Sequence, residues 1–210
     1  MTQKERQARS RGEILRAAME EFGSRGYDQV TMERICTVHS ISKGMMYHYY
    51  SNKDELFLLC VQATFQELTD HIRRGTEGLP AENTLEAIKG FFLLREEFFQ
   101  THPRQKTIFE NAMVHPPKHL REQIQELRGP IREVNRQFLE RVVARAKLRP
   151  GLRPEQVARY LESMQETFRG AVFRCQEESG KEDLHTMLEL SGELLEMILF
   201  GVVQQPEREG

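Results

Sequence analysis

The amino-acid sequence predicts an all-α protein, with an N-terminal three-helix unit that contains a helix-turn-helix and a larger C-terminal helical domain. Apolar residues recur at helical spacing along most of the 210 residues, whereas strand-like alternation between turn signals is almost absent. Two short helical patterns joined by a tight turn lie within residues 31–53. Proline and glycine then separate several longer helical patterns. We expect two domains, a helix-turn-helix domain at residues 1–53 and a larger helical domain at residues 54–210.

The first helix is predicted from about Arg11 to Ser24, and Gly26 stops it. Its apolar stripe consists of Ile14, Ala18 and Phe22. Because these positions share one helix face, we expect them to form the core of the N-terminal unit.

The two helices of the helix-turn-helix follow. Thr31 is predicted to cap the first of them, and Ser42 caps the second after the turn at 39–41. The inward face of the first helix is expected to consist of Met32, Ile35 and Val38. Ile41 and Met46 flank the Ser42 cap at the spacing of a hydrophobic staple, which orients the chain as it enters the second helix.

A long fourth helix is predicted to open with a capping box of Asn52 and Glu55 and to persist to about Arg74. The helices expected after it span about 83–100, 104–114, 118–147, 154–178 and 183–203. The Gly129-Pro130 pair is expected to kink or split the helix at 118–147, because proline removes a backbone donor.

Charge is distributed unevenly along the chain. The net charge is -2, but residues 1–53 carry nine Lys/Arg against six Asp/Glu, which is +3, and the remainder carries 21 against 26, which is -5. A basic head on an acidic body indicates that an anionic partner binds at the head. An architectural DNA-binding protein is disfavoured, because such proteins are usually basic throughout.

Cysteine usage and hydropathy favour a soluble, cytoplasmic protein. Cys36, Cys60 and Cys175 are far apart and form no CxxC pair, so neither a disulfide framework nor a zinc site is predicted. No apolar run approaches the length of a membrane span. Cys36 is expected to be a small core residue, and a metal or thiol sensor is the minor alternative.

No enzymatic activity and no cofactor are predicted. The sequence contains no Gly-rich phosphate loop after a strand and no GxSxG motif. His115 and His119 are four residues apart, but Pro116-Pro117 between them prevents a shared helix face. No metal site is therefore expected at this pair.

The second helix of the helix-turn-helix is dense in polar and aromatic residues, from Ser42-Lys43-Gly44 to Tyr47-His48-Tyr49-Tyr50. An exposed helix of this composition favours docking on the DNA backbone, with its N-terminal end toward the major groove. The predicted DNA contacts are Thr31, Ser42, Lys43, Gly44, Met45, Tyr47, His48 and Lys53. Base readout is assigned to Lys43, Met45 and Tyr47, whereas the other contacts position the protein. Tyr49 and Tyr50 are expected in the core or at an interface.

These residues carry a family resemblance. The segment 14–56 resembles the DNA-binding head of the TetR/AcrR-like transcriptional regulators, most specifically through Ile41-Ser42-Lys43-Gly44, Met46-Tyr47-His48-Tyr49-Tyr50 and Asn52-Lys53. The resemblance implies a homodimer on a palindromic double-stranded operator, and a ligand pocket in the C-terminal domain. Most members repress transcription until a ligand releases the DNA. A ligand-activated activator and an effector-independent DNA-binding protein are the alternatives.

The sequence departs from the family pattern in three places. His39-Ser40 stands where Ala-Gly is common, so serine must adopt a backbone angle that favours glycine. Met45 replaces a small polar residue, and Tyr50 replaces phenylalanine. These departures concern the base preference and leave the fold prediction unchanged.

The C-terminal domain is predicted to hold both the dimer interface and the effector. The helices at 154–178 and 183–203 carry apolar surfaces wider than a monomer needs to bury, which favours a four-helix interface between two copies. Aromatic residues and methionines are expected to line a pocket for a small hydrophobic or aromatic effector. The predicted lining residues are Phe99, Phe109, Met113, Phe138, Met164 and Phe168. Core packing is the competing interpretation at each of these positions.

Overall fold

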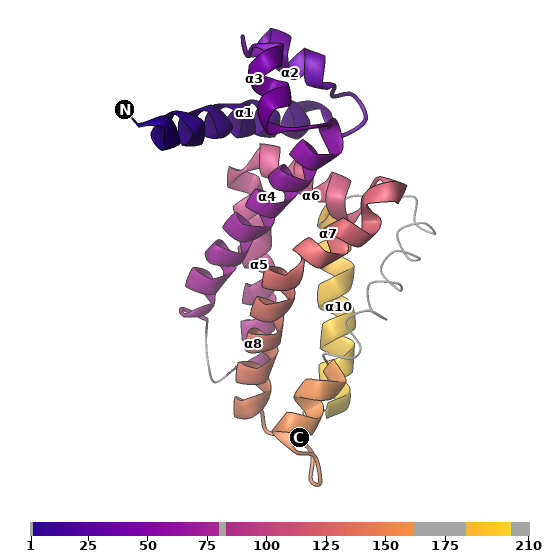
Figure 1. Ribbon diagram of the computed structural model, residues 1–210. Coiled ribbons are helices and arrows are strands. Elements are labelled where there is room, and N and C mark those ends of the chain that lie inside the picture. The colour runs from indigo at the N-terminus through magenta and orange to yellow at the C-terminus, as the bar shows by residue number, and fades with distance from the viewer. Residues whose placement is uncertain (1, 80–82, 162–183, 203–210) are drawn as a thin grey trace. The chain divides into compact units, whose positions relative to one another are not determined.

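The computed structural model describes residues 2–79, 83–161 and 184–202, and within these ranges the fold is all-α as predicted (Figure 1). The elements are α1 (Gln3–Arg25), α2 (Met32–Val38), α3 (Lys43–Tyr49), α4 (Lys53–Thr76), α5 (Thr84–Thr101), α6 (Pro103–Met113), the 3₁₀ helix η1 (Lys118–Leu120), α7 (Arg121–Leu127), α8 (Gly129–Arg145) and α10 (Leu184–Val202). Residues 154–161 are also helical. No helix of these ranges is both long enough and apolar enough to cross a membrane.

The chain forms two compact units. The first consists of residues 1–67 and 99–129, and the second of residues 68–98 and 130–210. The first unit therefore joins the helix-turn-helix to α6, η1 and α7. The predicted domains 1–53 and 54–210 are functional domains, one for DNA and one for the effector. The compact units follow different boundaries, so the functional division stays a prediction.

Helix α1 begins eight residues earlier than predicted. The Thr2 hydroxyl accepts the Glu5 backbone N–H at 3.2 Å, and the Glu5 carboxylate accepts the Thr2 N–H at 2.7 Å. This reciprocal capping box satisfies two backbone donors that the start of a helix otherwise leaves without a partner. The apolar stripe begins only at Ile14, which is why periodicity alone placed the start too late.

The helix-turn-helix forms as predicted, with one correction. The Thr31 hydroxyl caps α2 and the Ser42 hydroxyl caps α3, each accepting a backbone N–H at 3.1 Å. Ser40 in the turn adopts φ +53°, the left-handed angle that the family pattern assigns to glycine. The prediction that Val38 faces inward is wrong, because Cys36 completes the buried stripe of α2 and Val38 is 52% exposed at the last helical residue.

The core of the first unit contains the predicted stripe of α1. Ile14, Ala18 and Phe22 are fully buried. The Phe22 ring packs edge-on against Phe57 of α4, with 5.2 Å between ring centroids, and Tyr27 packs against the same ring at 4.9 Å. Edge-to-face contacts of this kind stabilise a core beyond the area that they bury.

Helix α6 packs directly against α1. A Cβ atom on Gly23 would lie 2.5 Å from Cβ and 2.8 Å from Cα of Arg104, so only glycine permits this approach. Gly26 ends α1 with φ +75°, and the next backbone N–H, that of Tyr27, donates to Oδ1 of Asn111 at 2.9 Å. The end of α1 is thus attached to α6 by a close contact and a hydrogen bond.

The second unit is built from the later part of α4, most of α5, α8 and α10. Its core includes Phe91 of α5 stacked on Phe138 of α8, with ring centroids 3.8 Å apart. The long helix predicted at 118–147 is divided into η1, α7 and α8, and α8 begins at Gly129, beside the proline expected to cause the break.

Two glycine substitutions in the same helix test the packing of α1 against α6. Gly23→Ala is expected to lower the free energy of unfolding by about 1–3 kcal/mol, because the added methyl overlaps the Arg104 backbone. Gly12→Ala is the matched control: nothing lies within 4 Å of its added Cβ, so it gains about 0.5–1 kcal/mol from helix propensity. Urea unfolding measures both changes, and equal effects of the two substitutions would contradict the close approach of the two helices.

Candidate nucleic-acid interface

Helix α3 has one buried side and one exposed side, as a DNA-reading helix requires. Met46 is fully buried, and Tyr50 just beyond the helix is 8% exposed. The residues on the exposed side are Lys43, Gly44, Tyr47 and His48. Because Met46 fills the core of the first unit, it sets the rotation of α3 and turns the polar residues outward.

The two cap residues remain open to a partner. Thr31 and Ser42 are exposed, and each hydroxyl oxygen accepts a backbone N–H from the first turn of its own helix. A hydroxyl that accepts one hydrogen bond still has its proton to donate. Both residues therefore combine a structural role with the capacity to donate to a phosphate oxygen.

At Gly44 no side chain projects from the surface of α3. Nothing lies within 4 Å of the position that a Cβ would occupy, so glycine is not required there by the protein's own packing. The position is exposed at the start of α3, between Lys43 and Met45. A backbone without a side chain permits close approach of an external surface.

Tyr47 is held by an acidic neighbour that the sequence analysis did not consider. Its hydroxyl donates to Oε1 of Glu33, on α2, at 3.1 Å. Hydrogen bonds from its own backbone and from Tyr47 lower the pKa of Glu33, and the bond to Glu33 raises the pKa of Tyr47. Glu33 is therefore an anion beside a predicted phosphate contact.

The remaining aromatic residues of α3 connect it to α1. The His48 ring packs edge-on against Tyr49 at 4.7 Å, and the Arg11 guanidinium lies 5.5 Å from the centroid of the Tyr49 ring. Tyr49 is half-buried and Tyr50 is buried, so their expected place in the core or at an interface agrees with their burial.

Lys53 is less available than the sequence indicated. It is half-buried, its ammonium donates to the backbone carbonyl of Tyr27 at 3.1 Å, and it lies 4.0 Å from the centroid of the Tyr27 ring. The Tyr27 hydroxyl in turn donates to Asp54, whose other oxygen lies 3.0 Å from Nε2 of His119. Burial, followed by the bond to Asp54, strongly raises the pKa of Tyr27. A phosphate contact by Lys53 has to share its ammonium with this network.

A buried carboxylate orients the helix-turn-helix on α1. Glu21 is 5% exposed, and its side chain meets Arg34 of α2 at 2.6 Å, Arg25 at 3.6 Å and His39 of the turn at 3.5 Å. A buried carboxylate needs partners such as the two arginines, because it loses its hydration. Sequence periodicity gave no signal for Glu21, since a glutamate next to Phe22 looks like an ordinary surface residue.

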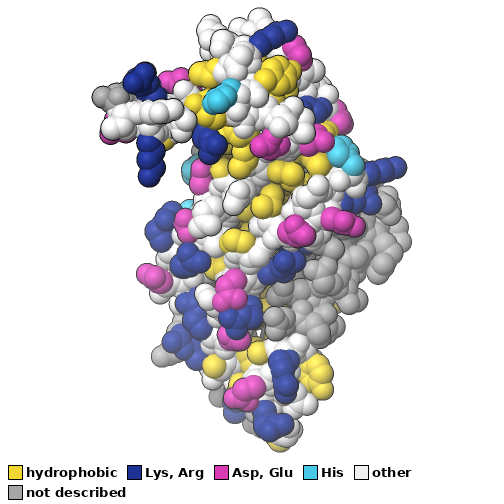
Figure 2. Space-filling model, viewed as in Figure 1, with side chains coloured by type: hydrophobic (Ala, Val, Ile, Leu, Met, Phe, Trp, Pro, Cys, Tyr) yellow, Lys and Arg dark blue, Asp and Glu magenta, His cyan; other side chains and the backbone are white. Residues whose placement is uncertain are grey.

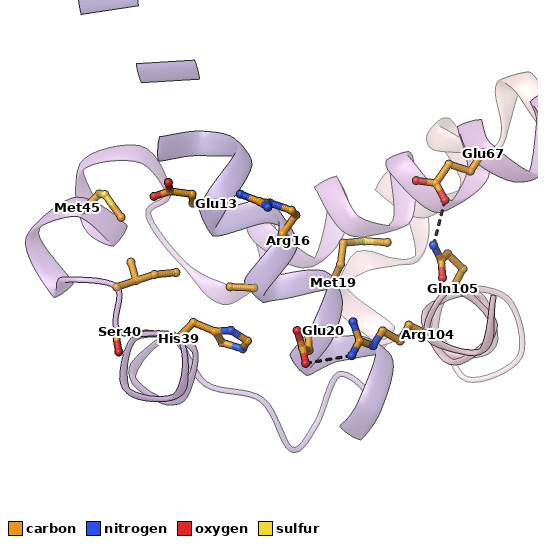
Figure 3. A pocket seen from close by; sticks show the side chains of 12 residues that line it. Glu13, Arg16, Met19, Glu20, His39, Ser40, Met45, Glu67, Arg104 and Gln105 are labelled. Carbon is orange, nitrogen blue, oxygen red and sulfur yellow. Dashed lines mark hydrogen bonds and ion pairs between the residues drawn. The ribbon is translucent and has the colours of Figure 1, made fainter. Parts of the chain in front are cut away.

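Met45, a predicted base contact, is half-buried at the edge of a groove in the first unit (Figure 3). The groove, of about 600 Å³, runs along α1 past the helix-turn-helix turn and the start of α6. Two of its charged side chains pair with each other, Arg104 with Glu20 at 3.0 Å, and Glu67 accepts a hydrogen bond from Gln105 at 3.0 Å. Base contact by Met45 stays a prediction.

The basic excess of the head lies on the first turns of α1, most of them ahead of the helix start predicted at Arg11. Residues 1–16 carry five Lys/Arg against two Asp/Glu, which is +3, whereas residues 17–53 carry four of each. Residues 2–9 are all exposed, and Figure 2 shows Lys and Arg side chains gathered along this end of α1. A helix end without buried residues and with this charge is a second candidate phosphate contact.

Four of the six predicted effector-lining residues belong to the part of the chain that the structure describes. Phe99 and Phe109 are buried in the first unit with ring centroids 4.9 Å apart, and Met113 of α6 is buried in the same unit. Phe138 is buried in the second unit, against Phe91. Met164 and Phe168 lie outside the described residues. Pocket lining by any of these side chains stays a prediction.

The geometry defines a helix-turn-helix protein: the long α1 and the short α2 and α3 share one core, and α3 presents a polar outer side. Comparisons with known proteins agree. Residues 14–60 match the family described as bacterial regulatory proteins, tetR family. Residues 14–60 therefore carry the DNA-binding region of the tetR family of regulators, as the sequence resemblance indicated.

Two curated relatives carry opposite regulatory names. The chain is 32% identical over 110 residues to the HTH-type transcriptional activator FasR of Mycolicibacterium smegmatis, which covers 51% of this chain and 49% of FasR. It is 25% identical over 116 residues to the HTH-type transcriptional repressor NicS of Pseudomonas putida, covering 54% of this chain and 52% of NicS. The chain thus spans about half the length of the curated relatives it matches.

A solved structure resembles the fold over most of its length. The transcriptional regulator FadR from Bacillus subtilis, in complex with stearoyl-CoA, has a TM-score of 0.62 to this chain and covers 90% of this chain and 97% of its own. The two sequences are 15% identical, so the likeness concerns the fold alone.

Removal of the Glu33 charge is expected to strengthen DNA binding. Glu33→Gln keeps an oxygen that accepts from Tyr47 but removes an anion beside the predicted phosphate contacts. We expect affinity for a DNA duplex to rise about two- to fivefold at 0.1 M salt, because two charges about 4 Å apart in water interact with about 1 kcal/mol. Glu155→Gln, an exposed site in the second unit, has the same change in net charge and should leave affinity unchanged. Fluorescence anisotropy measures both, and a weaker or unchanged Glu33→Gln protein contradicts this placement of Glu33.

Neutralisation of the start of α1 is expected to reduce the salt dependence of DNA binding. For Lys4→Gln/Arg6→Gln, the slope of log K against log salt should become shallower by about 0.9 for each phosphate that the protein no longer neutralises. Lys147→Gln/Arg153→Gln removes two exposed cations from the second unit and serves as the control. The same slope in all three proteins would exclude the start of α1 from the interface.

Proposed function

We propose that this protein is a sequence-specific transcriptional regulator that binds a palindromic operator as a homodimer and is controlled by a small, hydrophobic or aromatic ligand. The observation that carries the proposal is the division of α3, whose polar residues Lys43, Tyr47 and His48 are exposed while Met46 is buried in the core. Such a helix is positioned by its buried side and reads DNA with the other.

The proposed DNA contacts are Thr31, Ser42, Lys43, Gly44, Met45, Tyr47, His48 and Lys53. To these we add the basic start of α1. Phosphate contacts from hydroxyl and ammonium groups position the head, and base readout belongs to Lys43, Met45 and Tyr47. For Tyr47 to reach DNA, its hydroxyl exchanges Glu33 for an external acceptor.

The proposed dimer interface includes α10 and the helix that begins at residue 154. Leu184 and Leu188 are buried within the chain, whereas Met197 is 61% exposed and Tyr160 is 56% exposed. Leu194, Leu195 and Ile198 are half-buried. Apolar area that a single chain leaves open on a long helix supports association with a second copy. Residues 162–183 of the proposed interface lie outside the described residues.

Repression is the proposed direction, with release by the effector. A ligand-activated activator is the alternative, because the relatives FasR and NicS are named as activator and repressor. An effector-independent DNA-binding protein is the other alternative. Stearoyl-CoA, the ligand of the FadR structure, has a long apolar chain and is one probe for an effector screen. A protein with this function acts on chromosomal DNA in the cytoplasm.

Selection of random DNA duplexes by the purified protein tests the proposal. An inverted repeat is expected, because a twofold dimer presents two identical heads to DNA. Tyr47→Ala should weaken binding to the selected duplex at least about tenfold, since it removes both an aromatic contact and a phosphate donor. Sedimentation should still show a dimer. Recovery of no consensus would favour a ligand-activated protein or a non-specific, architectural DNA-binding protein. Full affinity of Tyr47→Ala would show that Tyr47 does not contact DNA.

A further inference from the structure

The second unit contains a buried positive charge. Arg95, on α5, is 7% exposed and is the only Lys or Arg that is buried among the described residues. Burial lowers its pKa to about 9, so the guanidinium remains charged at neutral pH. A buried charge is normally paired, because it has lost the hydration that stabilises it in water.

No carboxylate in the described residues pairs with Arg95. Three acidic residues of α5 and α8 meet other side chains: Glu96 lies 3.1 Å from His185, and Glu133 and Glu140 each meet Arg136 at 2.6 Å. The buried Glu21 of the first unit shows the contrast, since three cationic or titratable side chains surround it. Among the described residues, Arg95 therefore has no counter-ion, whereas Glu21 has several partners.

Two hydrogen bonds orient the Arg95 guanidinium without neutralising it. Nη1 donates to the backbone carbonyl of Phe91 at 2.8 Å, and Nη2 donates to Oδ1 of Asn135 on α8 at 2.6 Å. Both acceptors are uncharged. A guanidinium has five N–H groups, so three of those of Arg95 are not used by these bonds.

The surroundings of Arg95 are aromatic. The guanidinium carbon lies 4.0 Å from the centroid of the Phe91 ring and 5.7 Å from that of Phe92. Phe138, one of the predicted effector-lining residues, stacks on Phe91 at 3.8 Å. One fixed cation against an aromatic surface matches a ligand that has one acidic group on an apolar body.

A second polar group with unused capacity lies on α4, against the turn of α5 that follows Arg95. Nε2 of His71, on α4, is buried and has no hydrogen-bond partner. The His71 ring packs against Phe98 at 5.5 Å, and Phe98 follows Arg95 by three residues, one turn along α5. Residues three apart are neighbours on a helix surface, so two underused polar groups lie in the same part of the unit. When Nε2 of His71 carries the ring proton, it can donate to a carboxylate as the guanidinium does.

We propose that Arg95 is the anchor for the carboxylate of the effector, which is thereby an organic acid with an apolar aliphatic or aromatic body. The proposal rests on the ligand-controlled function proposed above and narrows its ligand class. The guanidinium binds the carboxylate through charge-assisted hydrogen bonds, and Phe91, Phe92 and Phe138 form the apolar surface beside it. Asn135 is a positioning residue that holds the guanidinium in place.

Calorimetric titration of the full-length protein in the absence of DNA tests the anchor. The probes are dodecanoate and 4-phenylbutanoate, each compared with the alcohol of the same carbon skeleton, and dodecyl phosphate. We expect at least one carboxylate to bind at least about tenfold more tightly than its alcohol, because a hydrogen bond to a charged group contributes a factor of that order. Arg95→Met should remove this preference, whereas Arg95→Lys retains part of it.

Thermal unfolding without ligand separates an anchor from a structural residue. If Arg95 binds an external anion, Arg95→Met should unfold at the same or a higher temperature, because methionine fills similar space without a buried charge that the described residues leave unbalanced. Arg136→Met is the control: it breaks the ion pairs to Glu133 and Glu140 and should leave the carboxylate preference unchanged.

Three results would overturn the proposal. In the first, Arg95→Met unfolds at a lower temperature but still prefers the carboxylate to the alcohol, so Arg95 has a structural role only. Another is tighter binding of dodecyl phosphate than of either carboxylate. The third is absence of binding by every acid. Because DNA is not present, these results do not depend on whether an inverted repeat is selected, and the DNA-binding proposal stands or fails separately.

Discussion

The first unit depends on helix α1 being packed on two sides. On one side Ile14, Ala18 and Phe22 form the core shared with the helix-turn-helix and α4. On another side Gly23 lets the backbone of α6 approach within a distance that any larger residue would forbid. Tight packing transmits small displacements because a close-packed core resists compression. If α6 moves, α1 must therefore resist the movement or move with it. The helices α2 and α3, which carry the candidate DNA contacts, share a core with α1 and would be displaced too.

The buried charges of the two units, Glu21 and Arg95, have different surroundings, and this difference indicates different roles. Glu21 has Arg34, Arg25 and His39 within 3.6 Å, so its charge is balanced inside the protein and serves to orient α2 and the turn on α1. Arg95 has only uncharged acceptors among the described residues. A balanced buried charge holds a structure together, whereas an unbalanced one favours a site for an ion of opposite sign.

Local sequence signals predicted the N-terminal unit well because its elements depend on local rules. The caps at Thr31 and Ser42 and the stop at Gly26 each depend on a residue type and its near neighbours. The sequence prediction was wrong at two places in this unit, Val38 and the start of α1. Val38 has the spacing of an inward residue, but Cys36 occupies the interior instead. The start of α1 escaped periodicity because its first turns have no apolar stripe and are set by the capping box of Thr2 and Glu5.

The sequence by itself determined the helical class, the position of the helix-turn-helix, the polar composition of α3 and the tetR-family character of residues 14–60, because periodicity, capping and turn chemistry act over a few residues. Only the tertiary structure showed that Glu33 holds Tyr47, that Lys53 is engaged by Tyr27 and that Arg95 is buried without a counter-ion among the described residues. Each of these facts joins residues from different elements or depends on burial. The energy of a charge depends on its distance to other charges and on its exposure to water, and the order of residues along a chain specifies neither.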